Sequence, residues 1–140
     1  MSKPNIYLDI DGVLLANESN AAPYAEEFLI YILDNYPGSV YWLTTHCWNG
    51  TNRTKEALLP AFSKNTINRL NEIKPTEWGT SKTDAIDFSK PFLWFDDDLY
   101  LPERIKLEEH QALNQWIEIN LTKDPNILKK IITNLKNNTY

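Results

Sequence analysis

Strand-like and helix-like segments alternate along this chain, and the alternation restricts its fold more than any other feature of the sequence. Four short runs are apolar and rich in β-branched or aromatic residues, which is typical of buried strands; they cover residues 6–10, 39–44, 91–95 and 116–119. Segments with apolar residues at helical spacing lie between and after these runs. Strands that alternate with helices predict an α/β fold with a mostly parallel sheet and helices on both faces.

The helical segments are recognised by their apolar stripes and by the proline and glycine residues at their ends. Pro37-Gly38 stops the first of them, and Pro60 interrupts the second. The predicted helical segments are residues 24–36, two pieces within 51–74, residues 83–88, residues 102–113 and a last helix after Pro125. Together with the strands, they predict a Rossmann-like domain of three α/β/α layers.

Length and composition narrow the class of protein. The 140 residues suit a single domain, residues 1–140, that buries a core without disulfides. The lone cysteine excludes a disulfide framework and a Cys-rich zinc site. With 14 Lys and Arg against 19 Asp and Glu, the net charge of −5 argues against general binding to nucleic acid or anionic membranes. No leader pattern and no membrane-length apolar run are found, so we expect a cytoplasmic protein with no membrane partner.

Three of the predicted strands end in polar residues. These residues are Asp9 and Asp11, then Thr44 and Thr45, then Asp96, Asp97 and Asp98. Ligand sites of parallel sheets lie beyond the carboxyl ends of the strands, so the three groups are expected to meet there. Crowded carboxylates repel one another unless a cation neutralises them, and Mg²⁺ prefers such oxygen ligands. The pattern therefore predicts a magnesium site suited to phosphate chemistry.

Asp9 and Asp11 are separated by one residue, and Gly12 follows them directly. Alternation along a strand would place both side chains on one face, and a turn at Gly12 would re-aim Asp11. One carboxylate is then able to attack phosphorus and form an aspartyl-phosphate. The other is able to protonate the leaving oxygen and then activate water.

The order of these motifs resembles the haloacid dehalogenase (HAD) superfamily. That family combines a strand ending in Asp-x-Asp-Gly-Val, a strand ending in Thr or Ser, a lysine at a helix start, and a strand ending in paired acids. The matching segments here are Tyr7-Leu8-Asp9-Ile10-Asp11-Gly12-Val13, Val40-Tyr41-Trp42-Leu43-Thr44, Lys82 in Ser-Lys-Thr-Asp-Ala-Ile, and Phe92-Leu93-Trp94-Phe95-Asp96-Asp97. The residues around the second and fourth motifs are similar to those of the small capless branch of this superfamily found in nucleic-acid repair proteins.

The resemblance implies a role for each matching residue. Asp9 is the implied nucleophile and a Mg²⁺ ligand, and Asp11 is the implied general acid and base, with its backbone carbonyl as a second ligand. Thr44 is expected to hydrogen-bond the transferring phosphoryl group. Asp96 is expected to ligate Mg²⁺, with Asp97 as a ligand or a neighbour of one. The run of three acids departs from the usual pair, so either Asp96 or Asp97 fits the position of the direct ligand.

The lysine and the lid are the two remaining features of the resemblance. Lys82 is expected to neutralise the phosphoryl oxygens and to keep Asp9 ionised, with Lys74 and Lys90 as alternatives for this role. About 30 residues separate Asp11 from Thr44, which leaves no room for a large cap at that point. The resemblance therefore implies an open site.

A second motif indicates a different chemistry. Cys47 and Arg53 are spaced as Cys-x5-Arg with His46 before the cysteine, which resembles the phosphate loop of cysteine-dependent phosphatases. Trp48 and Asn49 stand where that loop normally has small residues. The loop also leaves the aspartate clusters without a role, so we expect it to lie beside the aspartate site instead.

The leading hypothesis is a Mg²⁺-dependent phosphatase, a hydrolase of phosphate monoesters that acts through phospho-Asp9. Thr45 and Arg53 are the expected substrate-binding residues, and the substrate is a phosphorylated small molecule, a nucleotide or a nucleic-acid end. A nucleic-acid end would need the local basic residues Arg53, Lys55, Lys64 and Arg69. The alternatives are the cysteine-dependent phosphatase, a non-catalytic binding module on the same fold, and transfer of the phosphoryl group to an acceptor other than water.

Overall fold

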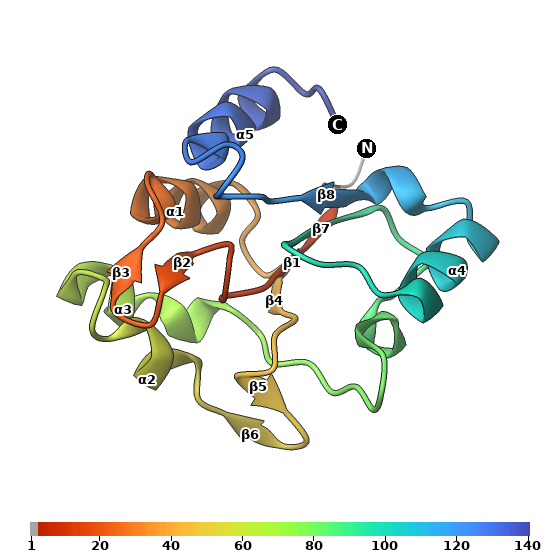
Figure 1. Cartoon of the computed structure of the whole chain (residues 1–140), viewed down its shortest axis with the longest axis horizontal. Helices are drawn as coiled ribbons and strands as arrows, with labels where there is room; N and C mark the ends of the chain where they lie inside the picture. Colours follow the sequence, from red (N-terminus) through yellow and green to blue (C-terminus); the bar gives the residue numbers. More distant parts are fainter. Residues whose placement is uncertain (1–2) are drawn as a thin grey trace.

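A parallel four-stranded sheet forms the centre of the protein. The computed structural model describes residues 3–140, and its sheet has the strand order β4-β1-β7-β8 (Figure 1). The strands are β1 (Asn5–Leu8), β4 (Val40–Trp42), β7 (Phe92–Asp96) and β8 (Trp116–Glu118), and every neighbouring pair is parallel. The predicted α/β class is confirmed.

The central strands are buried on both faces, and their side chains alternate between two hydrophobic clusters. Ile6 and Leu8 belong to one cluster, and Tyr7 between them belongs to the other. The first cluster packs against α1 (Ala25–Asn35) and α5 (Ile127–Lys136), and the second against α4 (Leu101–Glu109). The sheet therefore has helices on both faces, which gives three layers (Figure 1).

The register of the sheet brings the polar strand ends to the same level. Leu8 of β1 is paired with Trp42 of β4 on one side and with Phe95 of β7 on the other. Asp9 follows Leu8 directly, and Asp96 follows Phe95. Both aspartates therefore lie at the carboxyl edge, on the two central strands.

The helical pieces between β4 and β7 break where the sequence predicts. They are α2 (Thr54–Leu58), α3 (Lys64–Asn68) and the short 3₁₀ helix η1 (Leu70–Glu72), and Pro60 lies between the first two. Ser63 begins α3 as its N-cap, because its hydroxyl accepts a hydrogen bond from the Thr66 N–H. Ile67, Leu70 and Ile73 are all buried, which confirms the predicted apolar face.

Two β-hairpins depart from the sequence prediction. They are β2 (Leu15–Asn17) with β3 (Asn20–Ala21), and β5 (Cys47–Trp48) with β6 (Thr51–Asn52). In the second hairpin, Asn49 and Gly50 both have positive φ, the conformation that a two-residue Asn-Gly turn between strands adopts. The prediction that helix begins at residue 51 is therefore wrong by three residues, because this turn pairs residues 51 and 52 with residues 47 and 48.

Two predicted helices are shorter than expected. Residues 83–88 contain only the single 3₁₀ turn η2 (Lys82–Ala85), and α4 ends at Glu109. Gln111 follows α4 with a positive φ, which terminates the helix before the 3₁₀ turn η3 (Leu113–Gln115).

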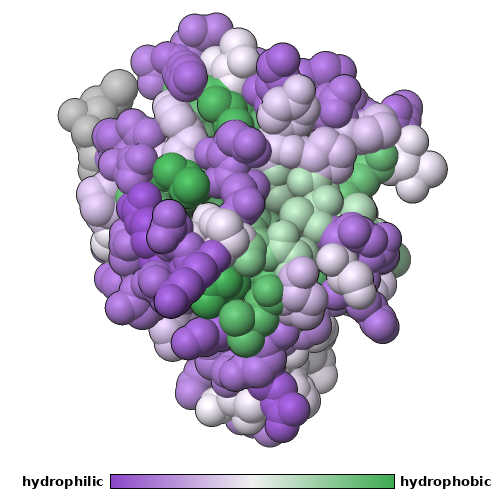
Figure 2. Space-filling model, turned by 90° about the vertical axis from the view of Figure 1, so that its left-hand side faces the viewer, coloured by the Kyte–Doolittle hydropathy of each residue, from purple (hydrophilic) through white to green (hydrophobic). Residues whose placement is uncertain are grey.

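None of the helices within residues 3–140 has the length and apolar character needed to cross a membrane. Figure 2 shows the side of the molecule that carries α1, α2 and α3. Polar side chains cover most of that face, and a smaller apolar area lies among them.

Candidate active site

A cavity of about 230 Å³ lies beyond the carboxyl ends of β1 and β7. Its lining includes six acidic residues (Asp9, Asp11, Asp96, Asp97, Asp98 and Glu103), the basic Lys82, the hydroxyls of Thr45 and Thr80, and the rings of Trp78 and Tyr100. The position is the one that the topology of a parallel sheet favours for ligands. Acidic groups therefore outnumber basic ones in the lining of this cavity.

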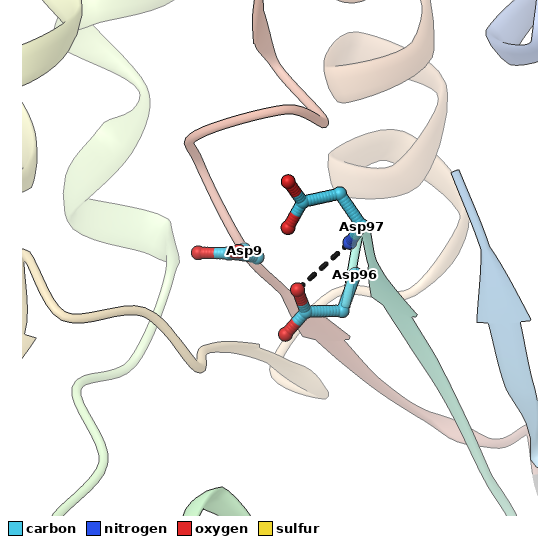
Figure 3. A group of neighbouring side chains, drawn as sticks. All are labelled: Asp9, Asp96 and Asp97. Atoms are coloured by element: carbon cyan, nitrogen blue, oxygen red, sulfur yellow. Dashed lines mark hydrogen bonds between the residues drawn. The ribbon is translucent and has the colours of Figure 1, made fainter. Parts of the chain in front are cut away.

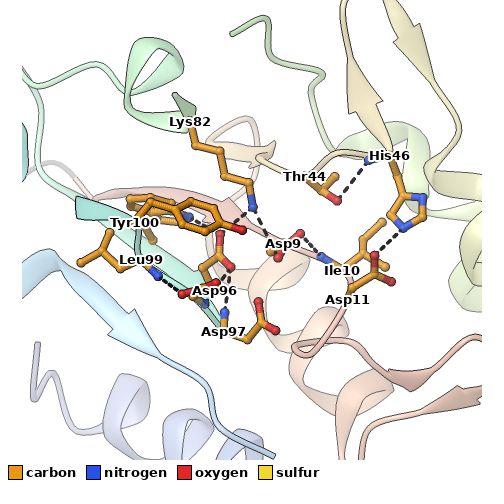
Figure 4. A network of polar contacts seen from close by, with 12 residues as sticks. Asp9, Ile10, Asp11, Thr44, His46, Lys82, Asp96, Asp97, Leu99 and Tyr100 are labelled. Carbon is orange, nitrogen blue, oxygen red and sulfur yellow. Dashed lines mark hydrogen bonds and ion pairs between the residues drawn. The ribbon is translucent and has the colours of Figure 1, made fainter. Parts of the chain in front are cut away.

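Asp9 and Lys82 form the centre of this site. Asp9 follows β1 and is buried, and its Oδ1 accepts a hydrogen bond of 2.8 Å from the N–H of Ile10. The Lys82 Nζ lies 3.4 Å from the Oδ2 of Asp9 and 2.7 Å from the Oδ2 of Asp96. One ammonium group therefore bridges the ends of β1 and β7 (Figure 4).

The carboxylate of Asp96 is surrounded by donors. Its Oδ1 accepts from the backbone N–H groups of Asp97 and Asp98, at 2.8 and 3.3 Å. Its Oδ2 accepts from the Lys82 Nζ at 2.7 Å and from the Trp94 indole Nε1 at 3.2 Å. A carboxylate has about four acceptor positions, so protein donors occupy all of those on Asp96.

The pKa values in the site report crowded negative charge. Burial, and then the charge of Asp9, raise the pKa of Asp96 to about 9, although Lys82 opposes the rise. Burial also raises the pKa of Asp97, with a further contribution from the charge of Asp9. Burial acts against the ammonium of Lys82, but the charges of Asp9 and Asp96 prevail and raise its pKa. The carboxyl groups of Asp96 and Asp97 therefore hold a proton more strongly than free carboxyl groups do.

Asp9, Asp96 and Asp97 are the residues that offer oxygens to a metal ion. One carboxylate oxygen from each lies within 4.8 Å of the others, and Figure 3 shows the three side chains pointing to the same side of the strand ends. Three hard oxygen donors this close together are of the kind that a divalent cation such as Mg²⁺ accepts. In contrast to Asp96, Asp97 has no contact within the described chain with Lys82 or with an indole N–H, and its hydrogen-bonding neighbours are the Asp96 side chain and its own backbone.

Gly12 brings the first motif close to Asp97. Its φ of +77° is a left-handed conformation that glycine adopts without strain. A Cβ atom at this position would lie 2.3 Å from the Oδ2 of Asp97. The turn after Asp11 therefore packs directly against the fourth motif, and only glycine fits between them.

Asp11 lies on the exposed side of the site. Its side chain is 66 % exposed, and its Oδ2 lies 2.9 Å from the Nε2 of His46 (Figure 4). The turn at Gly12 has thus directed Asp11 away from Lys82 and toward the β5–β6 hairpin. Asp9 and Asp11 therefore occupy different surroundings, one buried and one exposed.

The structure places Thr44, Thr45 and Arg53 differently from one another. Thr44 is fully buried after β4, and its hydroxyl accepts a 3.3 Å hydrogen bond from the backbone N–H of His46. Thr45 lines the cavity. Arg53 is exposed at the start of α2 and is not among the described residues that line the cavity. Its backbone N–H bonds to the carbonyl of His46, but its side chain does not line the cavity, so the structure does not place this predicted substrate-binding side chain in the site.

Within residues 3–140, the alternative lysines do not contact the carboxylates of the site, and one member of the predicted basic cluster is paired with acidic residues elsewhere. Lys74 lies over the ring of Tyr41 at the edge of the sheet, and Lys90 is exposed just before β7. Of the three candidate lysines, Lys82 is the one that contacts the carboxylates. Arg69 is bound by Asp34 and Glu72, which removes it from the basic groove considered for nucleic acid.

The Cys47 loop has the wrong geometry for a phosphate loop. Cys47 is buried, and its Sγ lies 4.0 Å from the carbonyl of Thr76. The backbone from Cys47 to Asn52 forms the β5–β6 ladder, whereas a phosphate loop turns its N–H groups inward around an anion. Nothing in this hairpin aims a thiolate and a ring of donors at one point.

Sequence reasoning missed Glu103 and the contact made by His46. Glu103 is buried; its two oxygens accept from the backbone N–H groups of Lys82 and Tyr100, both at 3.1 Å. It therefore fastens the segment carrying Lys82 to the start of α4. A glutamate three residues after the residue that caps a helix is a known capping signal, and Glu103 has this spacing from Tyr100, so the sequence alone could have predicted its contact with Tyr100. No local pattern reports the second contact, with Lys82, because 21 residues separate the partners.

Comparisons of the chain with models of known protein families, with curated proteins and with solved structures found no match. The contacts among its own residues are therefore what supports a functional proposal.

Proposed function

We propose that this protein is a Mg²⁺-dependent phosphatase of the HAD type, which hydrolyses phosphate monoesters through an aspartyl-phosphate on Asp9. The observation that carries the proposal is the position of Lys82, whose ammonium lies between Asp9 and Asp96 where two parallel strands end. An ammonium next to a buried carboxylate keeps that carboxylate ionised and therefore nucleophilic. The same charge is available to the phosphoryl oxygens as they approach Asp9.

The chain's own residues account for both halves of the reaction. Asp9 attacks phosphorus while Asp11 gives a proton to the leaving oxygen. Asp11 then accepts a proton from the water molecule that hydrolyses the aspartyl-phosphate. Its exposed position, apart from the buried nucleophile, suits a group that must exchange protons with substrate and water.

Asp9 and Asp97, with the backbone carbonyl of Asp11, are the residues that we propose hold the metal directly. Asp96 belongs to the same group, but its four acceptor positions are used by protein donors, so we assign it to Lys82. A bound Mg²⁺ supplies charge screening for the phosphoryl oxygens and for the crowded carboxylates.

The shape of the site favours a small substrate. The cavity of about 230 Å³ suits a phosphoryl group with part of its ester, and its rim carries the rings of Trp78 and Tyr100. A phosphorylated small molecule or a nucleotide fits this description. A nucleic-acid end is less favoured, because Arg69 is already paired and Arg53 lies outside the cavity.

Hydrolysis of an aryl phosphate, assayed with Mg²⁺ and with EDTA, tests the proposal. We expect activity to need Mg²⁺, to fall by more than about 10³-fold in Asp9→Asn, and to persist in Cys47→Ser. Activity that ignores EDTA and disappears only in Cys47→Ser would establish the cysteine mechanism instead. Mg²⁺ binding without turnover of aryl phosphates, nucleotides or phosphorylated oligonucleotides would favour a binding module.

The metal assignment has its own test. Calorimetric titration with Mg²⁺ should show that Asp97→Asn weakens binding by more than about tenfold, since it removes a direct ligand. Asp96→Asn should weaken it less, because that residue acts through its neighbours. An equal or larger loss in Asp96→Asn would make Asp96 the direct ligand.

A further inference from the structure

The histidine of the unused Cys47 motif contacts the second aspartate of the proposed site. The Nε2 of His46 lies 2.9 Å from the Oδ2 of Asp11, and the two side chains are 31 % and 66 % exposed. Within residues 3–140, His46 is the one side chain that makes a hydrogen bond or ion pair with the Asp11 carboxylate. The orientation of that carboxylate therefore depends on this contact.

The backbone of His46 is held on both sides. Its N–H donates to the Thr44 hydroxyl at 3.3 Å, and its carbonyl accepts from the N–H of Arg53 at 2.7 Å. The second contact closes the base of the β5–β6 hairpin. Arg53 thus contributes to the site through its backbone, although its side chain lies elsewhere.

The hairpin itself is anchored to the segment that leads to Lys82. The indole Nε1 of Trp48 donates to the carbonyl of Gly79 at 3.1 Å, and the same segment is tied to β4, the strand before the hairpin, by the Thr76 hydroxyl, which donates to the carbonyl of Trp42 at 2.5 Å. Trp48 also packs against Trp78, with ring centroids 6.1 Å apart. These contacts give His46 a fixed base from which to reach Asp11.

We propose that His46 is a positioning residue that fixes the carboxyl group of Asp11 for proton transfer. This inference rests on the proposed phosphatase function. The Nε2–H donates to Oδ2, which leaves Oδ1 as the oxygen that faces the reacting groups. An exposed carboxyl group without such a partner samples several rotamers, and each misplaced rotamer is lost to proton transfer.

The proton balance of both steps is compatible with this arrangement. In the first step Asp9 bonds to phosphorus, the bond from phosphorus to the leaving oxygen breaks, and the proton on Oδ1 of Asp11 passes to that oxygen. In the second step water bonds to phosphorus, its proton passes to Oδ1 of Asp11, and the bond from Asp9 to phosphorus breaks. His46 keeps its Nε2 proton throughout.

The leaving group decides how much the reaction needs His46. A nitrophenolate leaves without a proton, whereas the alkoxide of an ordinary alcohol leaves only when it is protonated. Fixing Asp11 therefore benefits phosphate esters of unactivated alcohols, the chemical class that includes sugar and nucleotide phosphates. An activated aryl phosphate should gain little from it.

Single-turnover measurements of phosphoryl transfer, with 4-nitrophenyl phosphate and with a primary alkyl phosphate, test the proposal. We expect His46→Ala to slow transfer from the alkyl phosphate by about 10- to 100-fold and transfer from the aryl phosphate by less than about threefold. His46→Gln, whose amide N–H reaches a similar position, should recover most of the loss. His110→Ala is the matched control, since His110 stacks on Phe88 away from the cavity and should change neither rate.

The outcomes separate this inference from the function on which it rests. Equal slowing of both substrates in His46→Ala, or a loss that His46→Gln does not recover, would overturn the positioning role alone. Turnover that Asp9→Asn leaves intact, or no turnover in wild type, would overturn the proposed function and this inference with it.

A nitrogen-15 spectrum of the imidazole rings adds a readout without turnover. His46 in the wild type should carry its proton on Nε2, and its Nε2 resonance should shift in Asp11→Ala, where the hydrogen bond is lost, while His110 serves as the reference in the same spectrum. A wild-type His46 with an unprotonated Nε2 would overturn the proposal.

Discussion

The two aspartates of the first motif lie in contrasting halves of one site. Asp9 is in the buried half with Lys82 and Asp96, where strand ends meet and every charge contacts another. Asp11 is in the exposed half, where its one polar side-chain partner among the described residues is His46 from a hairpin. The buried half shifts pKa values and holds its groups rigidly, whereas the exposed half leaves a carboxyl group accessible to substrate and water.

The difference shows how one short sequence produces two chemical environments. Asp9 and Asp11 are two residues apart, but β1 ends at Leu8 and the chain turns at Gly12, so the two side chains leave the strand end in different directions. A nucleophile benefits from burial beside an ammonium, and a proton carrier benefits from solvent access. Each half can be perturbed separately.

Removal of the Lys82 charge should disturb the buried half most. We expect Lys82→Met to lower the free energy of unfolding by about 3 kcal/mol in EDTA, because it leaves the buried Asp9 without its cation and Asp96 without one of its donors. Chemical denaturation at neutral pH measures this loss. The exposed Lys90→Met is the control and should change stability by less than about 0.5 kcal/mol. A loss below about 1 kcal/mol for Lys82→Met would show that the ammonium does not stabilise the cluster.

Gly12 lies where the two halves meet, and Gly38 provides a matched control. Both have a φ of +77°, but an added Cβ would meet Asp97 only at Gly12 and has open space at Gly38. Gly38→Ala should therefore show the backbone strain alone, about 1–2 kcal/mol. Gly12→Ala should lose roughly 1–3 kcal/mol more, because Asp97 must move, and it should bind Mg²⁺ more weakly. Equal losses of stability in the two variants would show that the contact between Asp97 and the turn at Gly12 does not affect stability.

The pH dependence of stability should come from the buried half. The pKa of Asp96 is raised to about 9, so between about pH 4 and pH 9 the folded protein holds a proton that the unfolded chain has released. The free energy of unfolding should therefore fall as pH rises from 5.5 to 8.5 in EDTA, by up to about 1.4 kcal/mol per pH unit.

Urea denaturation across that range measures the slope. Mg²⁺ should reduce it, because a cation favours the ionised carboxylates, and Asp96→Asn should flatten it. The raised pKa of Lys82 acts only above its ordinary value of 10.5, outside this window. If stability instead rises with pH in EDTA, the raised pKa of Asp96 is wrong.

Much of the fold and part of the site follow from local patterns. The apolar runs of β1 and β7 predict buried strands, and acids placed just after parallel strands meet because neighbouring strands share an edge. Other features need contacts between distant residues. The pairing of Lys82 with Asp96 spans 14 residues and that of His46 with Asp11 spans 35, and no periodicity reports either. The Asn49-Gly50 turn was a local signal for the β5–β6 hairpin, and its flanking strands are too short to show alternation.

The sequence by itself determined the alternation of strands and helices, the break at Pro60 and the polar residues that follow the strands, because periodicity and turn chemistry are local properties. Only the tertiary structure decided which carboxylate is saturated, which lysine reaches it and which histidine reaches Asp11. Those outcomes depend on the register of the sheet and on the path of the β5–β6 hairpin, which bring together groups far apart in the chain. Burial then sets the charge of each group, and burial is a property of the folded protein as a whole.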